Sequence, residues 1–161
     1  MIVGFKFKDP DGAEHWLTRR VVLDADPFFD ITDRRYLEPL EAAYVGETIY
    51  FRVIDPVCDT SDQKDSVELQ LTTASGLRRT LPLTETFTHS GVFKGYARLV
   101  YRGEAGAGKT PEALPVNYGD VVTARYQRKV EGQEGGYKPD EATLERRLLI
   151  YNCLLYTSPS P

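Results

Sequence analysis

Ile49-Tyr-Phe-Arg-Val53 decides the fold together with Val67-Glu-Leu-Gln-Leu-Thr72, because apolar residues alternate strictly with polar or amphipathic ones along both stretches. A period of two is typical of a β-strand that buries one face and leaves the other in water. Further segments with the character of short strands occur along the chain, at Ile2 to Lys8, Leu17 to Leu23, Leu77 to Leu83, Val92 to Tyr101, Val121 to Arg128 and Leu144 to Tyr151.

Turn signals separate these segments. They place glycine beside Asp, Ser or Tyr, at Asp11-Gly12, Ser75-Gly76, Ser90-Gly91 and Tyr118-Gly119-Asp120. Helical periodicity is nearly absent, and only Tyr36 to Ala43 could form a short helical turn, which Pro39 limits. Short strands with regular turns predict an all-β fold, an antiparallel β-sandwich.

Length and charge exclude several classes of protein. The 161 residues suit one ordinary domain, and 41% hydrophobic with 27% charged residues is typical of a globular chain. The 20 basic and 24 acidic residues give a net charge of −4 without a basic cluster, so we expect no nucleic-acid partner. No run approaches the roughly 18 apolar residues of a membrane span.

An internal repeat suggests a tandem array. Leu17-Thr-Arg-Arg-Val-Val-Leu23 returns 127 residues later as Leu144-Glu-Arg-Arg-Leu-Leu-Ile150. On this interpretation residues 1–12 are the last strand of a preceding module, residues 16–130 are a complete module, and residues 137–152 open the next one. The alternative is chance recurrence of a four-position match, and the repeat is the favoured interpretation.

The C-terminal segment has a different character. Cys153-Leu-Leu-Tyr-Thr-Ser-Pro-Ser-Pro161 resembles the translation of a sequencing adapter, so residues 153–161 are expected to lie outside the fold, and the chain to be a metagenomic fragment of something longer. Without this segment Cys58 is the one cysteine, and no disulfide is predicted.

Five pieces of sequence, in a fixed order, carry a family resemblance: Val45-Gly-Glu-Thr-Ile-Tyr-Phe-Arg-Val-Ile-Asp-Pro56, then Asp59 and Asp62 with Asp65-Ser-Val67, then Leu83-Thr-Glu-Thr86, His89-Ser-Gly-Val-Phe-Lys-Gly95 and Tyr118-Gly-Asp-Val-Val-Thr-Ala-Arg-Tyr126. Residues 43–126 thereby resemble the immunoglobulin-like β-sandwich repeats of very large bacterial surface or secreted proteins. Cys58 departs from that pattern, since such repeats more often carry Asp, Leu or Asn there.

The resemblance implies a function as well as a fold. It implies an immunoglobulin-like module on the cell surface or outside the cell, with a structural or adhesive role and neighbouring modules of the same chain as its partners. The resemblance does not identify a surface ligand.

Physical chemistry gives the motifs structural roles. Gly91 can adopt the positive φ of a turn, Phe93 is expected to enter the core, and Gly95 permits close packing of the facing sheet. The Glu85 carboxylate is expected to accept backbone N–H bonds from a neighbouring loop.

One motif points to nucleotide binding and fails its structural requirement. Gly103-Glu-Ala-Gly-Ala-Gly-Lys-Thr110 matches the phosphate-binding loop pattern, which needs a helix beginning at the lysine. Pro111 and Pro115 follow Lys109 too closely for that helix. A flexible loop between strands is therefore favoured, and we expect no nucleotide partner.

An acidic run offers the best candidate metal ligands. Asp55, Asp59, Asp62 and Asp65 could supply oxygens to Ca²⁺, which takes six to eight of them. The spacing matches no EF-hand and Lys64 lies within the run, so a solvated loop is favoured over a calcium site. No other cofactor is expected.

No catalytic residues can be assigned. His15 and His89 are far apart in the sequence, and Ser90 beside His89 points to the opposite side of an extended chain. The sequence therefore predicts a structural or adhesive module that is not an enzyme. The alternative is an accessory ligand- or carbohydrate-binding module of a secreted hydrolase, which a groove with two or three exposed aromatics would favour. Tyr50, Tyr96 and Tyr126 are expected at the sandwich surface or core edge.

Overall fold

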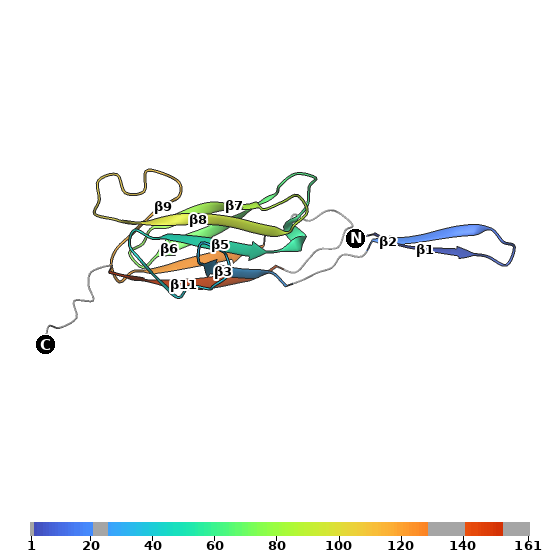
Figure 1. The fold of residues 1–161 in the computed structure, drawn as a ribbon, viewed down its shortest axis with the longest axis horizontal. Helices are drawn as coiled ribbons and strands as arrows, with labels where there is room; N and C mark the ends of the chain where they lie inside the picture. The colour runs from blue at the N-terminus through green and yellow to red at the C-terminus, as the bar shows by residue number, and fades with distance from the viewer. Residues whose placement is uncertain (1, 21–25, 129–140, 153–161) are drawn as a thin grey trace.

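The computed structural model describes residues 2–20, 26–128 and 141–152 (Figure 1). The described residues form eleven strands and one 3-10 turn, η1: β1 (Ile2–Lys8), β2 (Glu14–Arg20), β3 (Phe28–Thr32), β4 (Ala42–Tyr44), β5 (Thr48–Ile54), η1 (Pro56–Cys58), β6 (Ser66–Thr73), β7 (Arg78–Glu85), β8 (Val92–Tyr101), β9 (Ala113–Val116), β10 (Val121–Gln127) and β11 (Thr143–Tyr151). The predicted all-β class is confirmed. No helix in these three ranges is long and apolar enough to cross a membrane.

The strands form two sheets. β1 and β2 make a separate antiparallel hairpin, which Figure 1 draws beyond one end of the larger sheet. The larger sheet has the order β3-β5-β8-β7-β6-β10-β11-β4, with β9 beside β8. Two of its pairings, β11 with β4 and β8 with β9, are parallel, so the sheet is mixed where the sequence predicted antiparallel strands alone.

The larger sheet folds back on itself. β7 and β8 pair only at Thr84↔Lys94 and Glu85↔Phe93, which leaves two halves joined at a corner. β11 of one half packs against β3 of the other. This arrangement is compatible with a β-sandwich. Both halves send alternate side chains into one core, whose largest fully buried members are Phe29, Ile31, Ile49, Phe51, Leu69, Leu71, Leu83, Phe93, Leu99, Leu114, Tyr126 and Leu148.

The turn after β7 confirms three expectations. Gly91 has φ 60°, and a Cβ there would lie 2.8 Å from Pro56 Cα, so only glycine fits without strain. Phe93 is fully buried, with Ala97 and Leu99 on the same inward face of β8. A Cβ on Gly95 would overlap Leu83 Cδ2 of the facing half, so glycine sets the close approach there.

Residues 36–43, the one segment that could form a helical turn, do not form one. The Asp33 carboxylate accepts the backbone N–H groups of Leu37 and Glu38, and Tyr36 has φ 59°. These local bonds replace the bonds that a helix would make, and Pro39 has no N–H to contribute. The segment forms a tight turn that leads into β4.

The strand boundaries differ from the repeat interpretation. Residues 143–151, which that interpretation gave to a next module, form β11 and pair with β10 and β4 in the larger sheet. Leu148 and Ile150 are fully buried in its core, where they complete the apolar layer. β2 pairs with β1, so residues 14–20 belong to the same hairpin as β1 and not to the larger sheet. Residues 153–161 lie outside the described residues.

Candidate functional site

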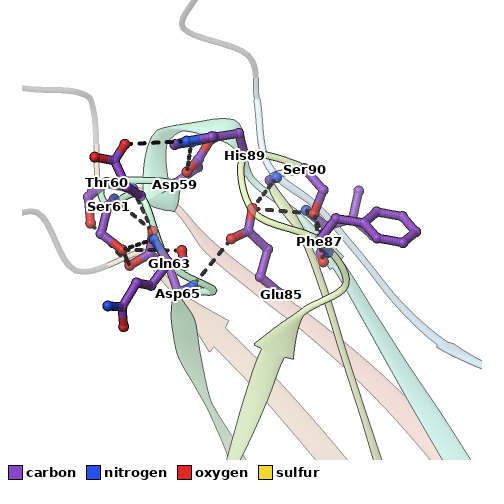
Figure 2. Close-up of polar contacts among 12 residues, drawn as sticks. Asp59, Thr60, Ser61, Gln63, Asp65, Glu85, Phe87, His89 and Ser90 are labelled. Carbon is purple, nitrogen blue, oxygen red and sulfur yellow. Dashed lines mark hydrogen bonds and ion pairs between the residues drawn. The ribbon is translucent and has the colours of Figure 1, made fainter.

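Three carboxylates meet beside the turn that joins β7 and β8 (Figure 2). Asp59 follows η1, Asp65 precedes β6 and Glu85 ends β7, and one oxygen of each lies within 4.8 Å of the others. We call Asp59, Asp65 and Glu85 the acidic corner. Two of its members belong to the predicted acidic run, and Glu85 was not among the predicted metal ligands.

Glu85 holds two loops together from a buried position. Its Oε1 accepts the Gly91 N–H at 2.7 Å and the Ser90 hydroxyl at 3.3 Å, and Oε2 accepts the Asp65 N–H at 3.2 Å. Burial raises the pKa of Glu85, but the bonds from Gly91 and Asp65 outweigh it, and the pKa is lowered. The predicted role of Glu85 as an acceptor of backbone N–H groups is confirmed.

Asp65 closes the loop in front of β6. Its Oδ2 accepts the backbone N–H groups of Thr60 at 2.7 Å and Ser61 at 3.0 Å, and Oδ1 accepts the Ser61 hydroxyl at 3.0 Å. The N–H bonds from Thr60 and Ser61 lower the pKa of Asp65. This carboxylate is therefore occupied by its own loop.

His89 lies beside the acidic corner and contacts two aspartates. Its Nδ1 lies 3.1 Å from Asp59 Oδ1 and its Nε2 lies 3.5 Å from Asp62 Oδ1. The hydrogen bond to Asp59 raises the pKa of His89, and the charge of Asp62 adds to the effect. The Ser90 hydroxyl contacts Glu85 and Thr86, so His89 and Ser90 do not form a catalytic pair.

Asp55 lies in a different environment from the rest of the acidic run. It is fully buried, and Arg128 donates to both of its oxygens at 2.8 Å while the Tyr126 hydroxyl donates to Oδ2 at 2.7 Å. The predicted group of four aspartates is thus divided: Asp59 and Asp65 lie together, Asp62 is exposed beside His89, and Asp55 is in an ion pair.

A signal for the Asp55 ion pair was present in the sequence. Asp55 continues the inward alternation of Phe51 and Val53, and Arg128 continues that of Ala124 and Tyr126. An acid and a base at inward positions of two strands imply a buried pair. The calcium hypothesis grouped Asp55 by spacing along the loop, whereas Asp55 directly follows β5 and continues its inward alternation.

Cys58 borders this ion pair without being activated by it. Its Sγ lies 3.3 Å from the Tyr126 hydroxyl and 3.6 Å from Asp55 Oδ2. Burial raises the pKa of the Cys58 thiol, so the thiolate that nucleophilic chemistry needs is disfavoured.

The segment from Gly103 to Thr110 is a loop of turns, and no helix begins at Lys109. Two of its backbone N–H groups, those of Ala107 and Lys109, bond to carbonyls within the loop. Arg79 of β7 donates to the carbonyls of Gly108 and Thr110. A phosphate-binding loop also needs a helix that begins at its lysine, and residues 101–112 form none.

A second feature is a shallow hollow where β7 and β8 separate. It has a volume of about 370 Å³. Tyr36 lies over one side, with its ring centroid 4.4 Å from Lys94 Nζ, and Tyr96 lies beside it on β8. Tyr50 contacts both rings at centroid distances of 5.3 and 6.3 Å. We call this feature the tyrosine hollow; its remaining lining residues are Leu81, Pro82, Thr84, Gly95, Pro111 and Glu112.

The three tyrosines singled out from the sequence separate in the structure. Tyr50 and Tyr96 are cross-strand neighbours on the outer face of β5 and β8, whereas Tyr126 is 1% exposed and belongs to the core. Tyr36 was assigned to a helical turn, and its place in the hollow follows from the tight turn instead.

Comparison with known proteins adds no identification. No protein-family model matches the chain, and no curated protein matches it at a significant level.

Proposed function

We propose that this chain carries a structural or adhesive module of a large bacterial cell-surface or secreted protein, arranged in tandem with neighbours of the same immunoglobulin-like kind. The observation that carries the proposal is that the sequence repeat falls on two equivalent strands. β2 and β11 are each the second strand of an antiparallel pair, and each carries the Leu-x-Arg-Arg motif from the leucine onward.

The chemistry of the described residues supports a non-catalytic role. Glu85 and Asp65 accept hydrogen bonds from loop backbone, and Asp55 is paired with Arg128. These contacts stabilise the structure, and the lowered pKa values of Glu85 and Asp65 make these two carboxylates poor general acids or bases at neutral pH. The interactions of Glu85, Asp65 and Asp55 therefore have a structural explanation that needs no catalytic role.

The path of the chain supports a role in a serial array. Figure 1 shows the chain entering the larger sheet at the end beside the hairpin and leaving along β11 at the opposite end. A unit linked through opposite ends of its long axis adds its length to an array and transmits force along its strands.

The test is mechanical. Four copies of residues 26–152 joined in series and stretched by atomic force microscopy should unfold in four equal steps of about 400 Å, close to the extended length of each copy. Unequal steps, or extension without force peaks, would overturn the proposal. A folded control domain of known step length at each end of the fusion calibrates the measurement.

The tyrosine hollow favours a second candidate function, an accessory module that binds carbohydrate. The exposed Tyr96 ring and the half-buried Tyr36 ring, beside Lys94 and Glu112, match the aromatic surface with convergent polar groups that sugar recognition uses. Titration calorimetry with neutral and acidic oligosaccharides tests it. Binding should be lost in Tyr96→Ala and kept in Tyr151→Ala, since both rings are 49% exposed and Tyr151 lies outside the hollow. Equal behaviour of the two variants would exclude it.

A further inference from the structure

The β1–β2 hairpin has one apolar face with no cover among the described residues. Phe5 pairs with Leu17 and Phe7 pairs with His15, so the four side chains share a face. Phe5, Leu17 and Phe7 are 66%, 55% and 43% exposed. The Phe7 ring stacks on Phe5 and on His15, at centroid distances of 6.3 and 5.3 Å. An isolated two-stranded sheet is marginally stable in water, so this face calls for a partner.

The other face of the hairpin is suited to solvent. Lys6 forms an ion pair with Glu14 at 2.5 Å, and its ammonium group lies 5.6 Å from the Trp16 ring centroid. Trp16 lies on the same face as Lys6 and is 67% exposed. The hairpin therefore has one face that is charged apart from this tryptophan and one face of Phe5, Phe7 and Leu17, which is suited to a core.

The larger sheet shows what covers such a pair. The sequence repeat aligns Leu17 with Leu144, and each leucine lies opposite an aromatic residue, Phe5 in β1 and Tyr126 in β10. Both pairs are antiparallel, and the leucine of the motif lies opposite the aromatic residue in each, so the two strand pairs share their register at this position. Tyr126 is 1% exposed, and its hydroxyl reaches Asp55, which directly follows β5 in the other half of the sheet.

We propose that β1–β2 is the last strand pair of a neighbouring module, and that its Phe5, Phe7 and Leu17 face completes the core of strands equivalent to β3–β9 in that module. The proposal rests on the proposed function, because it requires a neighbour of the same fold. The boundary between the two modules then lies after β2, whereas the sequence repeat placed it before residue 16.

The aligned positions also define the chemistry of the partner. In this module Tyr126 and Arg128 satisfy Asp55, through the hydroxyl group and the guanidinium group. The aligned positions in β1 are Phe5 and Phe7, which lack both groups. A buried aspartate opposite two phenylalanines would have no partner. The neighbouring module therefore carries an apolar residue at the position equivalent to Asp55.

The experiment joins a second copy of residues 26–121 directly ahead of Met1 of the full chain, which keeps the register of β10. The added copy carries the equivalent of Asp55→Leu to match Phe7. The expected result is that the β1 and β2 amides exchange with deuterium about 100-fold more slowly than in the chain alone. Phe5→Asp should abolish that protection, whereas Lys6→Asp, on the charged face, should leave it within about threefold.

A second variant guards against failure of the added copy to fold. With Asp55 retained in the added copy, hairpin residues Phe5→Tyr and Phe7→Arg rebuild the β10 pattern and should restore the protection. Unchanged exchange in both fusions, or equal effects of Phe5→Asp and Lys6→Asp, would overturn the proposal.

The oligomeric alternative has its own outcome. Protection that rises with concentration in the chain without the added copy would identify a second copy of this chain as the partner and also overturn the proposal. If the fusions fail while linked copies of residues 26–152 still unfold in equal steps, only this inference is lost; absence of the steps removes the proposed function itself.

Discussion

Asp55 and Glu85 are both buried acids near the same end of the larger sheet, but they are satisfied by different kinds of donor. Asp55 is bound by the side chains of Arg128 and Tyr126, which lie on or next to β10, more than 70 residues away. Glu85 is bound mainly by backbone N–H groups of Asp65 and Gly91. Asp55 therefore connects strands across the core, and Glu85 fixes the loops at its edge.

Gly91 links the two acids. Its carbonyl accepts the Asp55 N–H at 2.8 Å, and its own N–H donates to Glu85 at 2.7 Å. The comparison therefore predicts different costs for three kinds of change: loss of a side-chain partner in the core, distortion of the link, and loss of one loop bond at the edge.

Arg128→Met should have the largest effect. It leaves the Asp55 carboxylate buried without its cationic partner, which costs about 3–5 kcal/mol of unfolding free energy. Urea denaturation followed by far-UV circular dichroism, which reports on the strands, measures the loss. The matched double variant Asp55→Leu/Arg128→Met removes both charges and should recover most of the stability. Additive losses in the double variant would contradict the assignment of Asp55 and Arg128 as an ion pair.

Gly91→Ala should have the next largest effect, about 2–4 kcal/mol. The new Cβ meets the Pro56 backbone, and φ 60° is unfavourable for alanine, so strain and overlap add. Gly119→Ala is the matched control, because Gly119 has φ 80° with open space around its Cβ position. It should cost only about 1 kcal/mol. Equal losses would show that the contact with Pro56 is unimportant.

Glu85→Gln should cost about 1–3 kcal/mol, because the amide NH₂ then faces the Asp65 N–H and one donor is left unsatisfied. Glu85 has a lowered pKa, so its contribution is complete above the ordinary value of 4.5 and is lost as the pH falls through the folded pKa. The difference between wild type and variant should shrink in acid. Glu104→Gln, at an exposed position, is the control with no expected change; a pH-independent difference would contradict the role of the charge.

The same comparison explains what the sequence could predict. Strands from β5 to β8 with clear alternation were located within a few residues, and the roles of Glu85, Gly91 and Phe93 follow from local turn chemistry. β3, β4 and β9 are only three to five residues long, too short for periodicity to show. Alternation places Asp55 and Arg128 at inward positions, but which strands lie opposite each other depends on residues distant in the chain, and local patterns do not give that pairing. The tyrosine hollow depends on such distant residues as well.

His89 offers the smallest and most specific test, because it lies at the exposed side of the acidic corner. Its side chain is 58% exposed, so the ion pairs with Asp59 and Asp62 are partly screened and the effect on stability is small. The raised pKa means that its contribution is complete below the ordinary value of 6.5 and is lost as the pH rises through the folded pKa. His89→Asn should remove this dependence, since asparagine tolerates φ 63°.

The pKa of His89 itself gives the sharper measurement. Proton NMR titration should place it above 6.5 in wild type, and Asp59→Asn should bring it back toward that value, because the Asp59 hydrogen bond is the largest cause of the shift. Asp11→Asn, in the turn of the separate hairpin, is the matched control and should leave it unchanged. Added salt should reduce the part of the shift due to Asp62, which acts by charge at 3.5 Å. A wild-type pKa of His89 at or below 6.5 would contradict its hydrogen bond with Asp59. The acids at the edge of the fold would then be stabilised by the loop donors to Glu85 and Asp65 alone, in contrast to the Arg128–Asp55 ion pair in the core.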